Sequence, residues 1–445
     1  MDLPDPDRLP RRTYLQRLVA VGGTAALAAC LDATDDSSSP DSQQRVPTGD
    51  PDERPDSQHA WNDALEADDD GNLLAPAHHV LLSLSLTVEV DDAAREQVER
   101  AFQSLERAYA YDADGLLFTV SYTPAYFERI GVEPPLPKPT PLTNLEDDSL
   151  ELDTFDALVH LASNSPDVVL EAEEALMGEV SEPNDVEMAA DLTDVFERAE
   201  PRRTGFVGDG LPTEMAEKAG VDVSDELPDD APFFMGFRSG FTESQAPETR
   251  VTIQQGPYEG GSTTHVETLD LQLRTWFEQD DHFLRVAQLF SPEHANEELV
   301  GETGERLGQS TGVLGGIADR TRQDARSEGV VGHAQKAARG RDEDGTPPLL
   351  RRDFNTLDGD RPGLHFLCHQ RTIADFVRVR EAMAGADLAG QGVGQRHNNG
   401  ILQYIFVDRR GNYLTPPRHL RALPDHEDET EHSASTTETP ANHHR

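Results

Sequence analysis

Apolar and polar positions along the first half of the chain follow two periods. Strict alternation is typical of half-buried strands, and recurrence every three to four residues is typical of helices. The strands are expected at 78–90, 115–130 and 155–165, and the helices at 91–110 and 166–180. A proline-rich connection at 133–142 separates the second strand from the third. The order strand–helix–strand, then strand–helix, predicts a ferredoxin-like module with both helices on one face of an antiparallel sheet.

The second half repeats this order with more insertions. Strands are expected at 232–241, 260–273 and 362–370, helices at 274–291 and 371–385, and a closing pair of strands over 399–417 with a turn at 410–412. The helix at 371–385 places Ile373, Phe376, Val377 and either Val379 or Met383 on one face. We therefore predict an α+β fold of two tandem ferredoxin-like modules, residues 75–222 and 223–425, each an antiparallel sheet with helices packed on one face.

The first thirty residues have the pattern of an export signal. Adjacent arginines, Arg11 and Arg12, precede a short apolar stretch that is too short for a stable membrane span. Paired arginines indicate the twin-arginine route, which carries folded proteins. The segment LAAC ending at Cys30 is similar to a lipobox, in which the cysteine is lipidated. We therefore predict that the protein is exported and anchored by lipid to the outer face of the cell membrane. The alternative for this N-terminal segment is an ordinary helix of the protein core.

Two segments lack an apolar pattern. Residues 31–74 are rich in Asp, Ser and Pro, and residues 426–445 are rich in charged and small polar residues. Both compositions are typical of disordered, solvated chain. We expect an acidic linker and an acidic tail flanking the folded part.

The charge balance excludes some partners. The chain has 445 residues, with 38 basic and 84 acidic side chains and a formal net charge of −46. Such a surface repels nucleic acid and anionic membranes. Only Lys138, Lys218 and Lys336 are lysines, so nearly all positive charge is arginine. This balance favours a halophilic protein that is soluble at high salt, with an acidic, partly disordered protein as the alternative.

Three stretches carry candidate chemistry. A glycine-rich loop in RRTGFVGDGLP presents Asp209, a lone histidine, His333, follows a small apolar approach, and Arg351 comes eighteen residues later in LLRRDFNT. A strongly apolar strand and an amphipathic helix, GLHFLCHQRTIADF, follow at 363–376.

This set resembles the dye-decolorizing (DyP-type) peroxidases, a haem family of two ferredoxin-like modules. The resemblance covers roughly residues 78–424 and is most specific over 363–376, which matches the family's GLxFxCxQRDI strand and helix. It implies haem b as the cofactor, His333 as the axial ligand of the haem iron, and Phe366 among the residues that wall the porphyrin. It further implies Asp209 as the proton carrier and Arg351 as the cation that stabilises O–O cleavage. The implied substrates are hydrogen peroxide and either a small organic reductant or haem itself, since some exported relatives are associated with iron uptake and haem handling.

The chemistry suits these residue types. Peroxidase iron takes a neutral imidazole as its axial ligand. A carboxylate in a dry pocket can move a proton between the peroxide oxygens, and a fixed cation stabilises the developing charge.

The chain departs from the family pattern at three places. The loop from Gly205 to the aspartate is one residue longer than the family's G-x-x-D-G. The family has an arginine and an Asn-Pro pair after the histidine, but here His333 is followed by AQKAARGR. Thr372 replaces the family's aspartate in QRD. Structural alternatives also exist for each residue. His333 alone fits a core histidine, Asp209 an Asp-Gly turn, and the pair Arg351 and Arg352 a solvated edge. Cys368 fits a small buried apolar residue.

Two other functions stay open. A non-catalytic exported lipoprotein of the same fold could bind haem or another ligand, and the longer Asp209 loop favours it. A haem oxidoreductase related to chlorite dismutase shares the module architecture, but the Asp-Gly loop and the Arg351 segment favour the peroxidase. Oligomeric state leaves no signal in the sequence.

Overall fold

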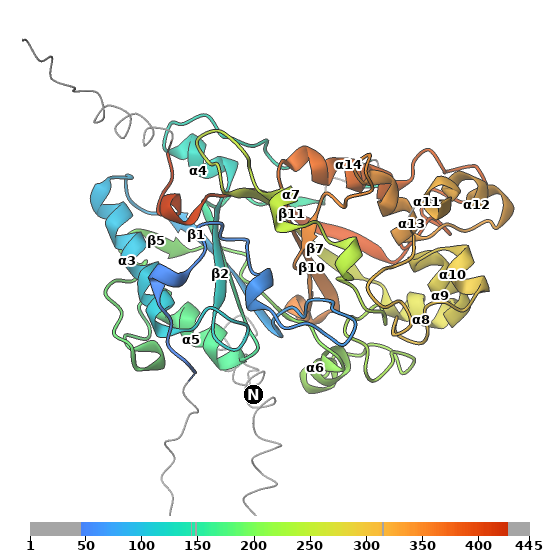
Figure 1. The fold of residues 1–445 in the computed structure, drawn as a ribbon, viewed down its shortest axis with the longest axis horizontal. Coiled ribbons are helices and arrows are strands. Elements are labelled where there is room, and N and C mark those ends of the chain that lie inside the picture. The colour runs from blue at the N-terminus through green and yellow to red at the C-terminus, as the bar shows by residue number, and fades with distance from the viewer. Residues whose placement is uncertain (1–45, 144, 147–148, 314–315, 426–445) are drawn as a thin grey trace, which may run out of the picture.

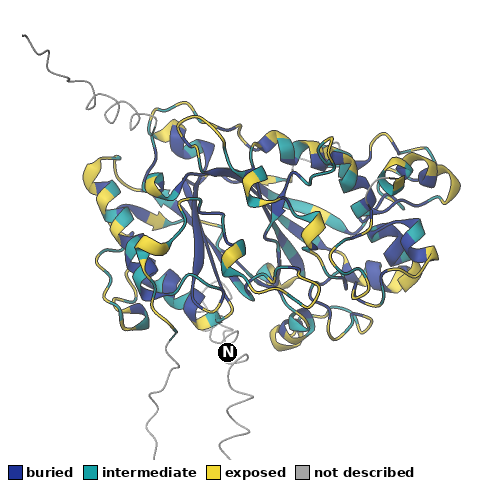
Figure 2. Ribbon diagram, viewed as in Figure 1, coloured by how far each residue is buried: buried dark blue, intermediate teal, exposed yellow. Residues whose placement is uncertain are grey.

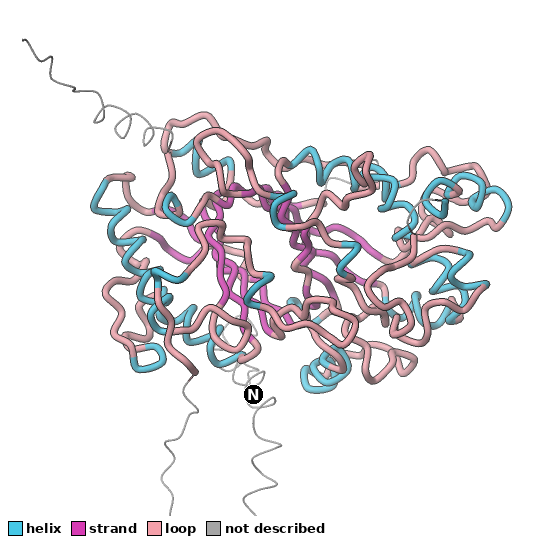
Figure 3. The backbone as a smooth tube through the Cα atoms, in the orientation of Figure 1, coloured by secondary structure: helices cyan, strands magenta, loops and turns pink. Residues whose placement is uncertain are grey.

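The computed structural model describes residues 46–425 except 144, 147–148 and 314–315, and shows a mixed α/β fold (Figure 1). Its strands are β1 (His78–Leu86), β2 (Leu117–Tyr122), β3 (Glu151–Leu152), β4 (Ala157–Ser163), β5 (Phe196–Arg198), β6 (Arg203–Phe206), β7 (Ser262–Leu271), β8 (Leu350–Arg351), β9 (Phe354–Thr356), β10 (Gly363–Gln370) and β11 (Ile405–Thr415). They occupy the centre of the molecule, with helices and long loops around them (Figure 3).

The helices lie on the outside of this sheet. They are α3 (Asp92–Ala108), α4 (Pro124–Arg129), α5 (Pro166–Leu176), α6 (Leu211–Ala219), α7 (Glu248–Val251), α8 (Leu273–Gln279), α9 (His282–Leu289), α10 (Pro292–Asn296), α11 (Gly316–Asp319), α12 (Thr321–Ser327), α13 (His333–Ala337) and α14 (Ile373–Ala384). Over the described residues, no helix is both long enough and apolar enough to cross a bilayer.

The sheet closes on itself. Its order is β2-β4-β1-β6-β9-β10-β7-β11-β3, and β11 also pairs with β2 through Leu414 and Tyr122. The two halves of the chain meet at a second point, where Phe206 of β6 pairs with Asn355 of β9. Neighbouring strands along the closed path are antiparallel. The sheet is therefore barrel-like, with one inner and one outer face.

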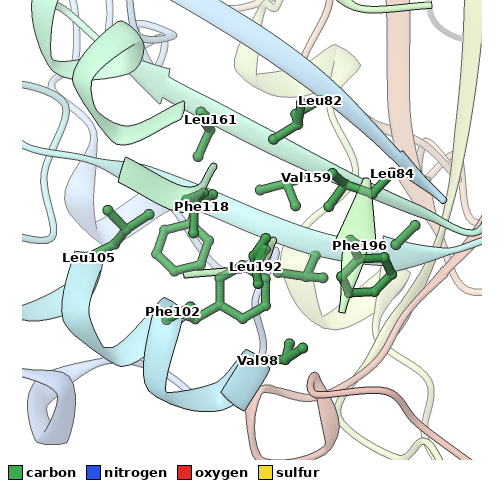
Figure 4. Packing of buried hydrophobic residues seen from close by; sticks show 14 of the residues in the cluster. Leu82, Leu84, Val98, Phe102, Leu105, Phe118, Val159, Leu161, Leu192 and Phe196 are labelled. Atoms are coloured by element: carbon green, nitrogen blue, oxygen red, sulfur yellow. The ribbon is translucent and has the colours of Figure 1, made fainter. Parts of the chain in front are cut away.

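Alternation along β1 explains how the N-terminal half packs. Leu82 and Leu84 point outward into an apolar core with α3 and α5, whereas Leu81 and Ser83 point inward. The outward core is filled by large side chains from strands and helices, including Phe102 of α3 (Figure 4). Asp91 caps α3 by accepting a hydrogen bond from the Ala94 N–H at 2.8 Å.

The inside of the barrel is partly polar. Apolar residues such as Leu81 and Phe354 share it with His79 and His160, whose rings hydrogen-bond at 3.0 Å. Burial lowers the pKa of His79 to about 3. These imidazoles are therefore neutral at neutral pH, which avoids the large free-energy penalty of buried charge.

The prediction of a disordered linker at 31–74 is wrong for residues 46–74. Trp61 is 1% exposed, and its indole N–H donates to the carbonyl of Gln58 at 2.9 Å. The Gln58 amide in turn donates to the carbonyl of Pro416 at 2.8 Å and accepts from the Val120 N–H at 2.9 Å. A single buried aromatic residue and a bridging amide thus fix a segment whose average composition is that of solvated chain.

Four element predictions need correction. The aromatic segment 232–241 forms turns, the strand expected at 115–130 ends at Tyr122 and is followed by α4, and the helix expected at 274–291 is two helices, α8 and α9. The break follows from Asp281, whose carboxylate caps α9 by accepting from the Leu284 N–H at 2.9 Å. The turn expected at 410–412 is absent, because β11 continues through these residues along β7 with a bulge between Val407 and Arg409.

The remaining predicted elements are present. β1, β4, β7, β10, α3, α5 and α14 all lie within the predicted ranges or overlap them closely. On α14, Ile373, Phe376 and Val379 are buried. The export signal at 1–30 and the tail at 426–445 lie outside the described residues.

Candidate functional site

A cavity of about 270 Å³ lies on the outer face of the sheet in the C-terminal half. Its floor comes from β7 and β10, and its opposite wall from α9, α13 and α14. Figure 1 shows these helices around the right-hand end of the sheet. Most of the lining is apolar, with Phe366 of β10 among the residues that form it. The predicted cofactor-binding residue Phe366 is therefore part of this wall.

His333 opens into the cavity from the first turn of α13. The ring forms no hydrogen bond with any described residue, although it is only half-exposed. Burial, followed by the positive charges of Lys336, Arg351 and Arg380, lowers the pKa of His333 to about 3. The imidazole is thus neutral near pH 7, which is the form that binds a metal ion.

Glycine at position 332 allows α13 to approach the end of α9. A Cβ at Gly332 would lie 1.7 Å from the carbonyl oxygen of Phe290, a distance that no side chain tolerates. That carbonyl accepts from the Gln335 N–H at 3.2 Å. The close contact fixes the backbone of His333 against the cavity wall.

Lys336 anchors the other side of the same helix. Its buried ammonium nitrogen donates to the main-chain and side-chain oxygens of Asn399 at 2.8 and 2.9 Å. Burial and the neighbouring Arg380 and Arg339 lower the pKa of Lys336 far below that of an ordinary lysine. Both ends of α13 are therefore held in place independently of any ligand.

Arg351 reaches the same cavity from β8. Its backbone is fixed by pairing with Cys368 of β10, and its guanidinium donates to the Ser239 hydroxyl at 3.1 Å. Among the described residues, no carboxylate lies within 4.0 Å of it. In a chain of net charge −46, this cation therefore lines the cavity without an ion-pair partner in the part of the chain that the structure describes.

Asp353 is a cavity residue that sequence reasoning missed. It lies two positions after Arg351 and so points to the same side of the chain, while Arg352 between them points into the barrel against Trp61. Its Oδ1 atom is buried and has no hydrogen-bond partner. Burial raises the pKa of Asp353, although Arg351 acts in the opposite direction.

Asp209 lies elsewhere. Its side chain is 58% exposed, and its carboxylate pairs with Arg238 at 2.9 Å. Arg238 lines the cavity, but Asp209 does not. The structure therefore brings His333, Arg351 and Phe366 together around the cavity. Asp209 does not reach the cavity, and its carboxylate pairs with Arg238, which lines it.

The loop 232–241 forms much of the remaining wall. Phe233, Phe234, Phe237 and Phe241 all line the cavity. Asn355 holds the loop in place, because its amide donates to the Pro232 carbonyl at 2.9 Å and accepts from the Phe234 N–H at 2.9 Å. Arg351, Asp353 and Asn355 are every second residue and all line the cavity. This two-residue spacing of polar side chains was the signal in the sequence that could have identified Asp353.

The two cysteines and two further histidines of β10 lie outside this site. Cys30 lies outside the described residues, and Cys368 is fully buried beside Gln370, as expected of a small apolar residue. His365 and His369 point into the barrel, away from Leu364 and Phe366. In the described part of the chain, no three His, Cys, Asp or Glu side chains gather as a metal site would require.

The residues present fit a flat, mostly apolar molecule that carries a metal and an anionic edge. The unpartnered imidazole of His333 supplies one ligand, which is what haem iron requires from the protein. The apolar walls suit a porphyrin, and Arg341 and Arg351 line the cavity without a carboxylate partner among the described residues. Such guanidiniums suit carboxylate groups of a ligand.

Comparison with known families gives one match over most of the chain. The model of a family of unknown function (DUF7405) matches residues 76–417. No curated protein matches the chain.

The fold is similar to that of solved DyP-type peroxidases. The DyP-type peroxidase from Cellulomonas bogoriensis has 16% identity and a TM-score of 0.51, with 77% of this chain and 90% of that chain covered. DyPB from Rhodococcus jostii RHA1 has 13% identity and a TM-score of 0.51, with 78% and 95% covered. A variant of Rhodococcus jostii DypB in complex with heme has 12% identity and a TM-score of 0.50, with 78% and 96% covered.

Proposed function

The chain belongs to the family of unknown function DUF7405, and we propose that it binds haem b and uses hydrogen peroxide to oxidise a small organic substrate. The fold shared with DyP-type peroxidases supports this proposal at the level of architecture. The residues of the cavity support it at the level of chemistry.

One observation carries the proposal. The neutral ring of His333 opens without a hydrogen-bond partner, among the described residues, into an apolar cavity that Arg351 also lines. A histidine with a purely structural role would be packed on all sides by other side chains, or its ring nitrogens would form hydrogen bonds. A ring left open in this way is suited to coordinate a metal.

Each residue has a separate task in this proposal. His333 holds the iron through a ring nitrogen, and Phe366 packs against the porphyrin. Arg351 places a fixed positive charge beside the oxygen that departs when the peroxide bond breaks. Bound haem supplies the electrons that reduce the peroxide, and the organic substrate returns them.

A haem-binding protein without catalysis is the second candidate. The exposed position of Asp209 and its pairing with Arg238 favour it, because this carboxylate was the expected proton carrier. The two candidates share the haem cavity and differ only in whether peroxide is turned over.

Export and domain organisation belong to the same proposal. The paired arginines Arg11 and Arg12 and the segment ending at Cys30 support export by the twin-arginine route and a lipid anchor outside the cell membrane. The strand orders β6-β1-β4-β2 and β11-β7-β10-β9 within the closed sheet support two ferredoxin-like modules joined edge to edge.

Reconstitution with haem tests the proposal. Purified protein in high salt is incubated with haem b, freed of excess haem, and examined for a Soret band and for peroxide-dependent oxidation of a dye. We expect one haem per chain and dye oxidation. His333→Ala should lose haem retention, whereas Arg351→Ala should retain haem and oxidise the dye roughly 10²-fold more slowly.

The outcomes separate the two candidates. A Soret band without dye oxidation would favour the non-catalytic protein. Absence of haem uptake by the wild type would contradict both. Arg322→Ala, which removes an exposed arginine outside this cavity, is the matched control and should behave as the wild type.

A further inference from the structure

We propose that Asp353 is the group that carries the proton in the cavity, a role that rests on the proposed haem function and that the resemblance to DyP-type peroxidases implied for Asp209. Its placement beside Arg351, its unsatisfied oxygen and its surroundings each contribute to this assignment.

The first step is position. Arg351 at the end of β8 and Asp353 in the connection from β8 to β9 line one cavity, yet no ion pair forms between them within 4.0 Å. The carboxylate and the guanidinium therefore face the cavity as two separate groups. A small molecule between them can contact a proton acceptor and a cation at once.

The second step is the unsatisfied atom. The Oδ1 atom of Asp353 is buried without a hydrogen-bond partner. Of the two carboxylate oxygens in this state among the described residues, those of Asp156 and Asp353, only that of Asp353 belongs to a residue that lines the cavity. Asp209 differs in both respects, since it is 58% exposed and already paired with Arg238. Of the two carboxylates, only Asp353 lines the cavity, and it forms no ion pair within 4.0 Å with any described residue.

The third step concerns the charged and titratable groups around Asp353. They are Arg351 on its own segment, the adjacent Arg352, whose side chain points into the barrel, Cys368 on β10, and, on the rest of the cavity lining, Arg238, Glu267, His333, Arg341 and Arg380. The arginines carry fixed charge. Burial alone would raise the pKa of Glu267, but His265, Arg380 and Arg410 lower it, and burial raises the pKa of Cys368 far above neutrality. Burial moves the pKa of Asp353 upward, toward the pH range in which a proton carrier works.

The proton transfer balances as follows. The Asp353 carboxylate accepts a proton from one oxygen of hydrogen peroxide and donates it to the other oxygen. That oxygen would leave as water with the electron pair of the O–O bond, and bound haem would supply the two electrons that the remaining oxygen lacks. Asp353 ends ionised, as it began, and Arg351 stabilises the departing oxygen.

Cyanide association tests the assignment without enzymatic turnover. Hydrogen cyanide must lose its proton when it binds ferric haem, so a base in the cavity speeds binding. Haem-loaded wild type, Asp353→Asn and Asp209→Asn are mixed with cyanide from pH 4 to 8 and followed at the Soret band. Asp353→Asn should slow association by roughly 10²-fold and abolish the rise in rate with pH that deprotonation of this carboxyl produces.

The controls keep the result decisive. Asp360→Asn removes an exposed carboxylate seven positions along the chain and should leave the rate unchanged. Wild-type rates in Asp353→Asn, or slowing confined to Asp209→Asn, would overturn the assignment. Failure of the haem function shows earlier and separately, as a wild type without a Soret band before any cyanide is added.

Discussion

The outer face of the closed sheet is covered in two different ways along its length. In the N-terminal half, α3 and α5 lie directly on β1, β2 and β4, and side chains such as Phe102 and Leu105 fill the space between them (Figure 4). In the C-terminal half, the cavity of about 270 Å³ separates β7 and β10 from the helices that cover them. Figure 2 shows the strands of both halves as mainly buried, so the difference lies above the sheet rather than in it.

The N-terminal core has the packing expected of a part that only stabilises the fold, whereas the cavity in the C-terminal half points to a ligand. Protein interiors pack to crystal-like density, and a half that needs only stability has no reason to keep a cavity. The unfilled half is also where His333 lacks a hydrogen-bond partner among the described residues and where Oδ1 of Asp353 is unsatisfied. Buried polar atoms without a partner also occur elsewhere, for example Oδ1 of Asp156 and Nδ1 of His160, but neither of these residues lines the cavity, whereas His333 and Asp353 do, which is the pattern expected of a ligand site.

Truncating one phenylalanine in each half should give the largest contrast. Phe102→Ala removes a 1%-exposed ring from the filled core and should lower the free energy of unfolding by about 3–5 kcal/mol. Phe366→Ala removes a half-buried ring that already faces the cavity and should cost about 1–2 kcal/mol. Urea unfolding at pH 7 in high salt measures both.

Haem retention should reverse the order of these two variants. Phe366→Ala should lose haem faster than wild type, and Phe102→Ala should retain it. Equal losses of stability in the two variants would contradict the contrast between a filled and an unfilled half.

Acid should weaken the barrel interior before it affects the ion pairs. Burial lowers the pKa of His79 to about 3 and, with a smaller effect of Arg352, that of His59 to about 4. In the unfolded chain these histidines protonate near pH 6.5. Keeping them neutral in the folded protein therefore costs no free energy above that pH, and the free energy of unfolding decreases as the pH falls from 6.5 toward the pKa values of the folded state. Each histidine should account for about 2 kcal/mol between pH 6.5 and 5.

The measurement is the urea midpoint as a function of pH, compared between wild type and His59→Gln. The variant should show a shallower decline over pH 6.5 to 5. Glu106, whose pKa is lowered to about 2 because Arg418 and Arg421 outweigh the effect of burial, should contribute only below about pH 4.5. Identical slopes in the two proteins would show that His59 is not held neutral.

Asp353→Asn should stabilise the haem-free protein by a smaller amount. Because burial raises the folded pKa of Asp353, the wild type loses stability as pH rises through that value, whereas the variant does not. The gain should be about 1–2 kcal/mol at pH 7 and should vanish below about pH 4, where the carboxyl is protonated in both states. Urea unfolding at the two pH values measures it, and a loss of stability at pH 7 would contradict the unsatisfied state of Oδ1.

Much of the fold was predictable because local patterns dominate it. The alternation of β1 and β10 and the amphipathic spacing of α14 are readable in the sequence and are confirmed. The closure of the sheet was not predictable, since it depends on one pairing between Leu414 and Tyr122, almost three hundred positions apart. The order around Trp61 was missed for the same reason, because its partners are distant in sequence.

The site was predictable in part. His333, Arg351 and Phe366 lie around one cavity, as the resemblance to DyP-type peroxidases implied. The resemblance also directed attention to Asp209 and away from Asp353, which lies two residues after Arg351 and lines the same cavity. The spacing of aromatic residues in 232–241 is typical of a strand, but these residues form turns that line the cavity and are held in place by hydrogen bonds with Asn355.

Restoring a missing ligand from solution tests the central claim most directly. His333→Gly should bind haem weakly and lack the wild-type ferric spectrum, because the iron loses its ring nitrogen. Added imidazole should enter the vacated space and restore that spectrum, while it leaves the wild type unchanged. A His333→Gly protein with the wild-type spectrum before imidazole is added would contradict the account, since the iron would then be held by another residue.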